Sequence, residues 1–293
     1  TDAEEDGASG RPAKNLTEKI AALKERKTRH EGLLEELERT GQSQVSLTDP
    51  DSRAMASHPK VGVGYNAQVA FDAKHKLIVE QHVTNAGSDL GLLAQTAGAA
   101  KEVLGVQRIE AVADKGYYKG EDMQACEDVG IEAYIARPQR GSAVRDGLFR
   151  KEEFRYDPTS DTYLCPGGQQ LHPLYRCVKG DHTTVQYCNR DACRGCELKP
   201  QCTANTYRRV GRWTEEAVLD RMEARLAARP EILKQRREIA EHPFGSIKQW
   251  MNQGAFLLRG LEKVRAEFSL TALAYNFIRV VNIVGVATLL KAV

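Results

Sequence analysis

Hydrophobic positions near the start of the chain follow the alternating four-three spacing of a coiled-coil seam. The seam is formed by Leu16, Ile20, Leu23, Lys27, His30, Leu34 and Leu37. A coiled coil of about three heptads with two polar seam positions is only marginally stable. We therefore expect a helix here that either pairs with a second copy or packs against the rest of the protein.

The next part of the chain alternates between strand-like and helix-like patterns. Residues 41–60 are polar and turn-rich, which predicts a connection. The β-like runs 65–71 and 77–83 flank a short polar stretch and predict a hairpin. The elements predicted after them are a helix, a strand, a helix and a strand, at residues 89–104, 108–113, 120–129 and 131–136. This order predicts an α/β fold with a mixed sheet.

Residues 137–212 break the pattern, because they are rich in Gly, Cys, Arg and turn residues and contain six of the seven cysteines. Helices are predicted again afterwards, at 215–229, 231–251 and 262–290. Pro243 is expected to kink or divide the second of them. The expected domains are a leader with the coiled-coil-like helix (1–45), the first part of a core (46–136), a Cys-rich basic insertion (137–212) and a helical second part of the core (213–293).

Composition narrows the class of protein without deciding its function. The 293 residues are 41% hydrophobic and 28% charged, which is typical of a soluble globular protein. The 42 Lys and Arg residues nearly balance 40 Asp and Glu residues, so the overall charge gives no argument for nucleic-acid binding. The apolar run 280–290 is too short for a membrane span, which needs roughly 20 residues. We expect a cytosolic protein without a membrane-spanning helix.

Two acidic residues occupy positions that suit catalytic carboxylates. Asp114 follows the predicted strand 108–113, and the carboxyl ends of sheet strands are where α/β proteins place ligands and metals. Arg237, Glu241 and Lys248 fall within about 40° of one another around a straight helix. Each signal alone also fits an ordinary structural role, since an aspartate often begins a turn and Arg and Glu four residues apart often form an exposed ion pair.

Taken together with other motifs, these residues resemble the DDE transposases of bacterial insertion sequences. The motifs are Ala-Asp-Lys-Gly-Tyr-Tyr (113–118), Arg-x3-Glu-x6-Lys (237–248), Arg-Gly-x2-Lys-Val (259–264), Leu-Ala-Tyr-Asn-Phe-Ile-Arg (273–279), Thr-Asp-Pro-Asp-Ser-Arg (48–53) and Gly-Tyr-Asn-Ala-Gln-Val (64–69). The similarity extends over about residues 45–290 and is to the group marked by a Tyr-x2-Arg-x3-Glu-x6-Lys signature. Lys234 replaces the tyrosine of that signature.

The resemblance implies a ribonuclease H-like fold in which two aspartates and a glutamate hold two Mg²⁺ (or Mn²⁺) ions. By position, Asp114 is the second acid and Glu241 the third. Two such ions stabilise the attacking and leaving oxygens of phosphodiester cleavage. The cations expected to contact the DNA backbone are Arg237, Lys248 and Lys234. The implied partners are double-stranded DNA, at transposon ends and targets, and further copies of the chain on that DNA, in the bacterial cytosol or nucleoid.

The first aspartate of the family is expected upstream of this sequence, on a strand before the coiled-coil-like segment. The chain opens with neither an initiator Met nor a secretion signal, which favours an internal start. Asp49, Asp51 and Asp72 lie in predicted turns and are not favoured as replacements. The alternative function is a non-catalytic DNA-binding or oligomerisation remnant of a transposase, and a third is a metal nuclease without end specificity.

The cysteines of the insertion form a second candidate site. Cys188, Cys193, Cys196 and Cys202 have the spacing C-x4-C-x2-C-x5-C, with Cys165 and Cys177 upstream. Four such thiols close together in a cytosolic protein argue for metal rather than disulfides, and tetrahedral Zn²⁺ is the expected ion. An iron–sulfur cluster and unliganded thiols remain alternatives. The resemblance includes a Cys-rich insertion at this place. Cys126 is expected in the core as a small apolar residue.

Overall fold

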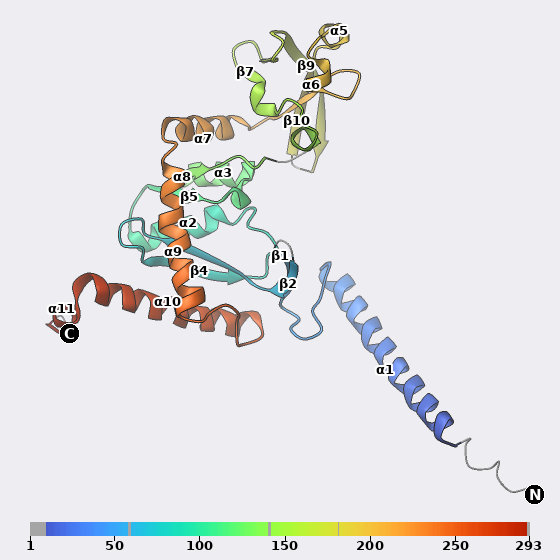
Figure 1. Cartoon of the computed structure of the whole chain (residues 1–293), viewed down its shortest axis with the longest axis vertical. Coiled ribbons are helices and arrows are strands. Elements are labelled where there is room, and N and C mark those ends of the chain that lie inside the picture. Colours follow the sequence, from blue (N-terminus) through green and yellow to red (C-terminus); the bar gives the residue numbers. More distant parts are fainter. Residues whose placement is uncertain (1–9, 58–59, 140–141, 181, 292–293) are drawn as a thin grey trace, which may run out of the picture. The chain divides into compact units, whose positions relative to one another are not determined.

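The computed structural model (Figure 1) describes residues 10–57, 60–139, 142–180 and 182–291, so residues 1–9 of the expected leader lie outside the described part. The chain divides into two compact units. Unit 1 consists of Thr1–Ala67, Val83–Ser88 and Ala255–Leu270. Unit 2 consists of Gln68–His82, Asp89–Gly254 and Thr271–Val293.

Unit 1 contains the predicted long helix and a strand pair that the sequence pattern did not predict. Helix α1 (Gly10–Thr40) includes the whole predicted seam, and seam residues such as Leu16 and Leu34 are each 59% exposed. Strands β1 (Arg53–Ser57) and β2 (Lys60–Gly64) are antiparallel; β1 lies in the region expected to be a connection, and β2 begins at its last residue. Backbone pairing holds them without an apolar face, because β2 residues such as Val61 remain exposed, and the pattern therefore gave no strand signal.

The α/β elements of the chain follow the predicted order. They are β3 (Asn66–Phe71), β4 (Ile78–Thr84), α2 (Leu93–Leu104), β5 (Ile109–Ala113), α3 (Gly120–Asp128) and β6 (Ile131–Ile135). Strands β3 and β4 pair as the expected hairpin, and β5 and β6 pair in parallel. Within the described residues each pair stays two-stranded, so the expected single mixed sheet is divided.

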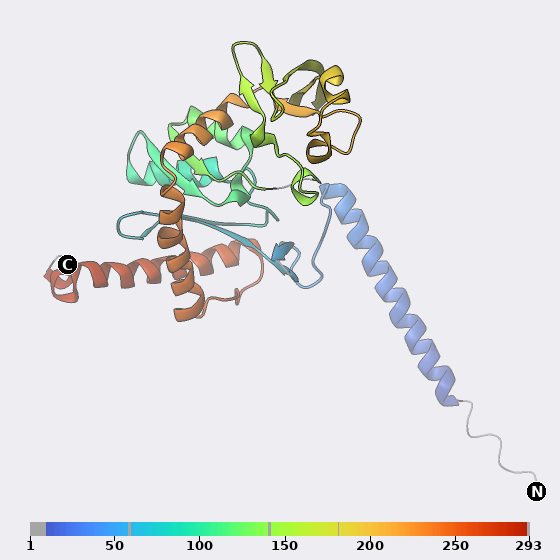
Figure 2. The same ribbon diagram turned by 45° about the horizontal axis from the view of Figure 1, so that its top comes forward.

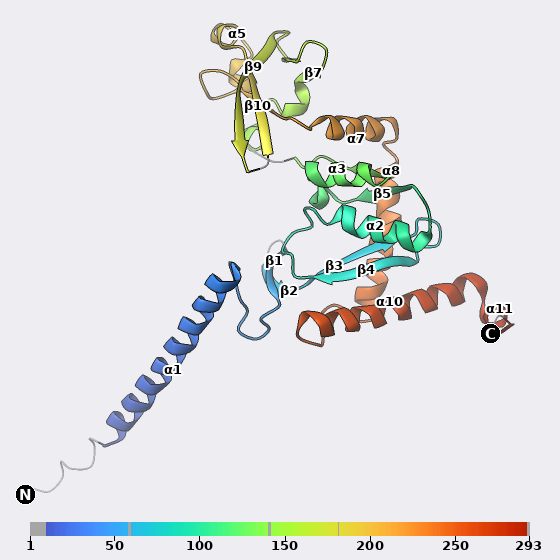
Figure 3. The ribbon, with the colours of Figure 1, turned by 180° about the vertical axis from the view of Figure 1, so that it is seen from behind.

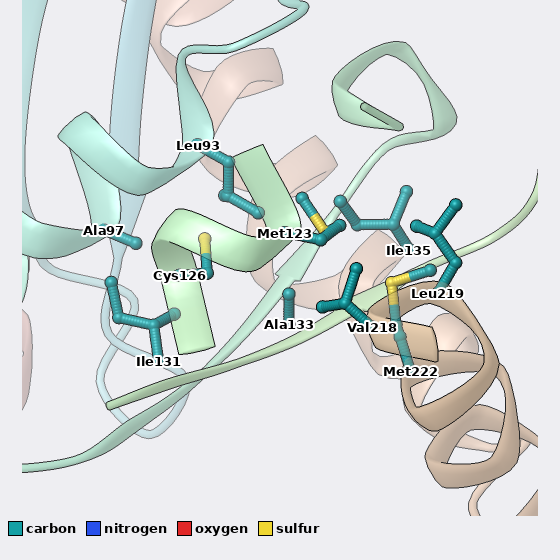
Figure 4. Close-up of a cluster of buried hydrophobic side chains, with 10 residues drawn as sticks. All are labelled: Leu93, Ala97, Met123, Cys126, Ile131, Ala133, Ile135, Val218, Leu219 and Met222. Carbon is teal, nitrogen blue, oxygen red and sulfur yellow. The ribbon is translucent and has the colours of Figure 1, made fainter. Parts of the chain in front are cut away.

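The main apolar core of unit 2 forms where α2, α3 and β6 meet α7 (Ala217–Ala228). Figure 4 shows its side chains, which are Leu93, Ala97, Met123, Cys126, Ile131, Ala133, Ile135, Val218, Leu219 and Met222. Each large buried member contributes roughly 1.5–3 kcal/mol relative to an exposed position. Cys126 is 0% exposed, and burial raises the pKa of its thiol to about 12, which confirms its expected place in the core.

Residues of the Cys-rich segment build a sheet of their own (Figure 3). The strands are β7 (Arg155–Asp157), β8 (Thr162–Leu164), β9 (Gln170–Lys179), β10 (His182–Cys188) and β11 (Val210–Trp213), in the order β11-β10-β9-β8-β7. A separate cluster of buried side chains, Phe154, Tyr163, Leu171, Tyr187 and Val210, packs on this sheet. Most of β9 is exposed, which explains why the sequence showed little periodicity here.

The helix that follows α7 contains two π segments while its ribbon stays continuous (Figure 2). It consists of α8 (Ile232–Arg236), the π segment η3 (Arg237–Glu241), α9 (His242–Gly245) and the π segment η4 (Ser246–Trp250). Pro243 has no N–H for the carbonyl of Ile239, and a π turn precedes it. The angular positions expected for Glu241 and Lys248 around a straight α-helix therefore do not apply, because a π turn contains more residues than an α turn.

The last predicted helix is divided into α10 (Leu261–Val284) and α11 (Val286–Lys291). Gly285 separates them with φ 77°, a left-handed conformation that favours glycine. In the part of the chain that the structure describes, no helix is both long enough and apolar enough to cross a membrane.

Candidate functional site

Asp114 lies directly after β5, at the carboxyl end of the parallel strand pair. It is exposed and begins the short 3-10 helix η1 (Lys115–Tyr117). One carboxylate oxygen, Oδ1, accepts the backbone N–H of Lys115 at 2.8 Å. The carboxylate is thus held at the strand end in a fixed orientation and remains open to solvent.

A polar network surrounds this strand end. Gln68, which is 1% exposed on β3, accepts a hydrogen bond from the Tyr117 hydroxyl at 2.5 Å and donates to Asp89 at 2.9 Å. Burial, followed by the Asp89 charge, raises the pKa of Tyr117 above its ordinary value. A Cβ atom on Gly116 would lie 3.1 Å from the Asp89 carboxylate. Asp89 therefore packs closely beside the turn that carries Asp114, and sequence reasoning did not identify it.

Glu241 is the last residue of η3 and is exposed beside two arginines. Its Oε1 accepts from Arg236 at 3.2 Å and lies 4.0 Å from Nε of Arg237. The ordinary i, i+4 ion pair is therefore present, although the side chains of Arg237 and Glu241 are 78% and 57% exposed. Exposed pairs of this kind contribute about 0–1 kcal/mol, so the carboxylate is easily released for another ligand.

The opposite side of the same helix is anchored in an apolar cluster. Ile247 is 2% exposed and packs with Ile78, Ala272 and Tyr275. Phe244 meets the ring of Phe71 edge to face at 5.4 Å. Because this side is buried, Glu241 and the exposed cations Lys234, Arg237 and Lys248 are left to solvent.

Within the described residues, no group of three or more His, Cys, Asp or Glu side chains is arranged to hold a metal ion. Asp114 and Glu241 both belong to unit 2, and no hydrogen bond joins them in the described part of the chain. Their assignment as two acids of one site stays a prediction.

The other aspartates considered from the sequence have structural roles. Asp49 accepts the Tyr65 hydroxyl at 2.7 Å and the N–H of Gly260 at 3.3 Å. Asp51 accepts the N–H of Leu261, the first residue of α10, at 2.9 Å. Asp72 accepts a backbone N–H inside the β3–β4 turn. Helix capping and turn formation therefore occupy these carboxylates, in agreement with the turns expected from the sequence.

The motif at 273–279 holds the β3–β4 hairpin. The Asn276 side chain exchanges two hydrogen bonds with the backbone of Ile78, both at 2.8 Å. The Tyr275 hydroxyl donates to the Lys76 carbonyl at 2.8 Å, and Arg279 donates to a further carbonyl of the turn at 2.7 Å. This block of the resemblance therefore has a structural role in unit 2.

Four cysteines of the insertion line one small cavity of about 30 Å³. They are Cys165, Cys193, Cys196 and Cys202. Burial raises the pKa of the Cys202 thiol, Arg208 lowers it, and the other three sulfurs raise it, which is consistent with one shared neighbourhood. Cys188 lies at the end of β10, 6% exposed, opposite His172 of β9. Cys165 was the cysteine of this set that the spacing argument left out.

Several cations of the basic segments are used inside the protein. Arg137 contacts Glu223 at 2.6 Å, and Lys151 contacts Glu216 at 2.7 Å. Arg212 is 8% exposed, with an ion pair to Asp220 on α7. These pairs join the insertion to the helix after it. The three cations are therefore used inside the protein and add less to a basic surface than the count of Lys and Arg residues in the insertion indicates.

The comparison with protein families matches part of the chain. Residues 164–281 match the family model of a transposase DDE domain. The match supports a DDE transposase family and covers the cysteine cavity and Glu241, whereas Asp114 lies before it. Searches of curated proteins and of solved structures gave no match.

The transposase DDE match therefore includes the elements that hold Glu241 in place. It spans α7 with its core residues, the π-containing helix and all of α10 except its last three residues, including the hairpin-holding motif. The mixed α/β architecture is consistent with such a domain.

Proposed function

We propose that this chain acts in metal-dependent cleavage and strand transfer of DNA at transposon ends. The observation that carries the proposal is the match to a transposase DDE domain over the segment with Glu241, which lies exposed on a firmly anchored helix. Asp114, exposed at the carboxyl end of β5, is the second carboxylate of the proposed site.

The donor set fits Mg²⁺ or Mn²⁺. These ions prefer carboxylate oxygens, and both carboxylates reach solvent with only weak or partial use of their oxygens. When bound, a pair of such ions neutralises developing charge on the attacking and leaving oxygens. Arg236 and Arg237 orient the Glu241 carboxylate, and the Lys115 N–H orients that of Asp114.

The cations on the Glu241 helix suit contact with the phosphate backbone. Lys234, Arg237 and Lys248 are exposed on one anchored helix, with Lys234 and Arg237 about one turn apart and Lys248 about three turns further on. Each phosphate contact releases a counterion, so binding through these residues depends strongly on salt. Such contacts position the duplex without reading its sequence.

The divided sheet supports a further strand in the complete site. The pairs β3–β4 and β5–β6 each have unpaired edges among the described residues, and such edges favour pairing with another strand. The Gln68–Tyr117 hydrogen bond connects β3 to the end of β5. A strand between these two would complete one mixed sheet beside Asp114. This is the position that suits the first carboxylate of a ribonuclease H-like core.

The test is cleavage of DNA that carries the sequences flanking the gene, by protein expressed from the whole gene, with Mg²⁺. We expect free 3′ hydroxyls at the ends and their transfer to target DNA. Asp114→Asn and Glu241→Gln should each reduce cleavage by roughly a thousandfold or more. Glu238→Gln is the matched control, since Glu238 is exposed on the same helix segment.

Each other outcome would indicate a different function for this protein. End-specific binding without cleavage by the whole-gene product would indicate a non-catalytic DNA-binding remnant, a possibility kept open by the lack of an assembled three-acid group in the described residues. Cleavage regardless of the flanking sequences would indicate a general nuclease. Unchanged cleavage after Glu241→Gln would exclude the proposed site.

A further inference from the structure

The cavity in the Cys-rich sheet brings together cysteines from three separate segments. Cys165 begins the turn between β8 and β9, and Cys193 lies on the short helix α5 (Arg190–Arg194). Cys196 follows that helix, and Cys202 ends α6 (Lys199–Cys202). The remaining wall is largely apolar, with Phe149, Phe154, Leu171 and Leu198. Thiols from separate segments therefore converge on a space that offers little to any hydrophilic ligand except a metal ion.

The turn at Cys165 faces the loop at Cys196. A Cβ placed on Gly167 would lie 3.7 Å from the Cys165 sulfur and 3.8 Å from the Cys196 sulfur. Both sulfurs thus flank the same glycine, which leaves room between them. Any side chain at this position would enter that space.

The turn is also organised around its sulfur. Gly168 N–H donates to the Cys165 carbonyl and Cys165 N–H to the Gln169 carbonyl, both at 2.9 Å. The Gln169 N–H donates to the Cys165 sulfur at 3.4 Å. Backbone N–H groups directed at sulfur stabilise a thiolate, as hydrogen bonds around metal ligands commonly do.

Arg208 supplies a positive charge at the same cavity. It donates to the carbonyls of Cys202 and Phe149, both at 2.9 Å, and its guanidinium lies over the Phe154 ring. Its Nε–H is buried and has no hydrogen-bond partner among the described residues. Four thiolates around a divalent ion carry a net charge of −2, and a guanidinium beside them offsets part of that charge.

We propose that Cys165, Cys193, Cys196 and Cys202 bind one structural Zn²⁺ ion. Zinc deprotonates the thiols, closes four Zn–S bonds of about 2.3 Å and releases the protons to solvent. The sulfurs do not yet form a metal-holding group in the described structure. Rotation about one χ1 angle moves a sulfur by roughly 3 Å, so rotamer changes can bring them together without moving the backbone.

The ligand set differs from the one that sequence spacing suggested. Cys188 is excluded because it does not line the cavity. Its buried position in the sheet, opposite His172, indicates a packing role. Cys177 is exposed on β9 opposite Thr184, also away from the cavity. Cys165 takes the fourth place. The ion would tie the β8–β9 turn to α5 and α6, which makes its role structural and independent of DNA cleavage.

The experiment is metal analysis of the whole chain, purified in zinc-containing medium without chelators. We expect about one zinc per chain, reduced by at least tenfold in each of Cys165→Ser, Cys193→Ser, Cys196→Ser and Cys202→Ser. Cys188→Ser and Cys177→Ser are the matched controls and should retain the ion. X-ray absorption should show four sulfur neighbours at about 2.3 Å.

Other results overturn the proposal. Zinc lost from Cys188→Ser but kept by Cys165→Ser would restore the set expected from spacing. A disulfide between two of the four cysteines, or iron in place of zinc, would exclude the zinc assignment. If a serine variant fails to fold, substitution of Co²⁺ into the wild-type chain decides the matter, because a spectrum without tetrahedral thiolate bands contradicts the proposed ligands.

Discussion

The cysteine cavity and the two acids of the proposed DNA-cleaving site differ in how far the described chain assembles them. The four cysteines surround one cavity beside a sheet and an apolar cluster that belong to the same segment. Asp114 follows β5, and Glu241 lies on a helix that packs against β4. These two strands belong to separate two-stranded sheets. A site made from neighbouring turns is complete when its own segment folds, whereas a site at a sheet edge needs every strand of that sheet.

Removal of zinc should give the largest effect on this comparison. A structural zinc site contributes several kcal/mol to the fold that it ties together. A chelator should therefore increase hydrogen exchange in β7–β11 and in α5, the helix that carries Cys193. Elements α2, α3 and β6 should keep their protection. Equal loss of protection in both regions would contradict the separation of the two cores.

Arg208→Ala should destabilise the Cys-rich region by about 2–3 kcal/mol. The change removes two part-buried hydrogen bonds to backbone carbonyls and the contact with Phe154. Denaturant unfolding measures the effect, and Arg209→Ala, an exposed neighbour, should change stability by less than about 0.5 kcal/mol. Similar values for the two variants would show that Arg208 is only a surface cation.

Glu127 of α3 provides a pH-dependent test of the core formed by α2, α3, β6 and α7. Burial alone would raise its pKa, but hydrogen bonds from Arg221 and Arg225 on α7 lower it below the ordinary 4.5. Because the folded-state pKa is the lower one, the stabilisation is present above pH 4.5 and is lost as the pH falls through the folded value.

Glu127→Gln should accordingly reduce stability at pH 7 by about 1–2 kcal/mol and reduce the acid dependence of unfolding. The expected readout is the denaturation midpoint measured between neutral and acid pH. Asp128→Asn, at the next and exposed position, is the control. A parallel pH profile for wild type and Glu127→Gln would refute the role of the α3–α7 ion pairs.

The smallest effect is expected in unit 1. Asp51→Asn weakens the cap on the first N–H of α10 and should cost about 0.5–1 kcal/mol. Thermal unfolding measures it, and Asp51→Ala should cost more than Asp51→Asn. No change in either variant would mean that the Asp51 contact with Leu261 contributes nothing to stability.

Local patterns predicted most elements of the fold. Strand β5, helix α3 and strand β6 were predicted to within two residues, because period and punctuation agree there. The β1–β2 pair was missed because backbone pairing and side-chain hydrogen bonds, such as that from the Ala54 N–H to Gln44, hold it without a buried apolar face. The π segments were missed because the need to accommodate Pro243 depends on how the whole helix packs.

The candidate sites were predicted less completely. Motif order proposed Asp114 and Glu241, and their assignment to one site stays a prediction, because no local pattern specifies the long-range arrangement of β5 and the Glu241 helix. Cysteine spacing selected Cys188 rather than Cys165, because spacing along the sequence does not show where the chain turns back on itself. The tight Pro-Gly-Gly turn after Cys165 was the sequence signal that could have shown that this thiol returns toward the later cysteines.

The most direct measurement is the distance between the Asp114 and Glu241 carboxylates in a crystal structure of the protein with DNA and Mn²⁺. The proposed function predicts a separation within about 8 Å, close enough to share two metal ions about 4 Å apart. Carboxylates on opposite sides of the fold, with metal bound at neither, would contradict the assignment of these residues to one DNA-cleaving site.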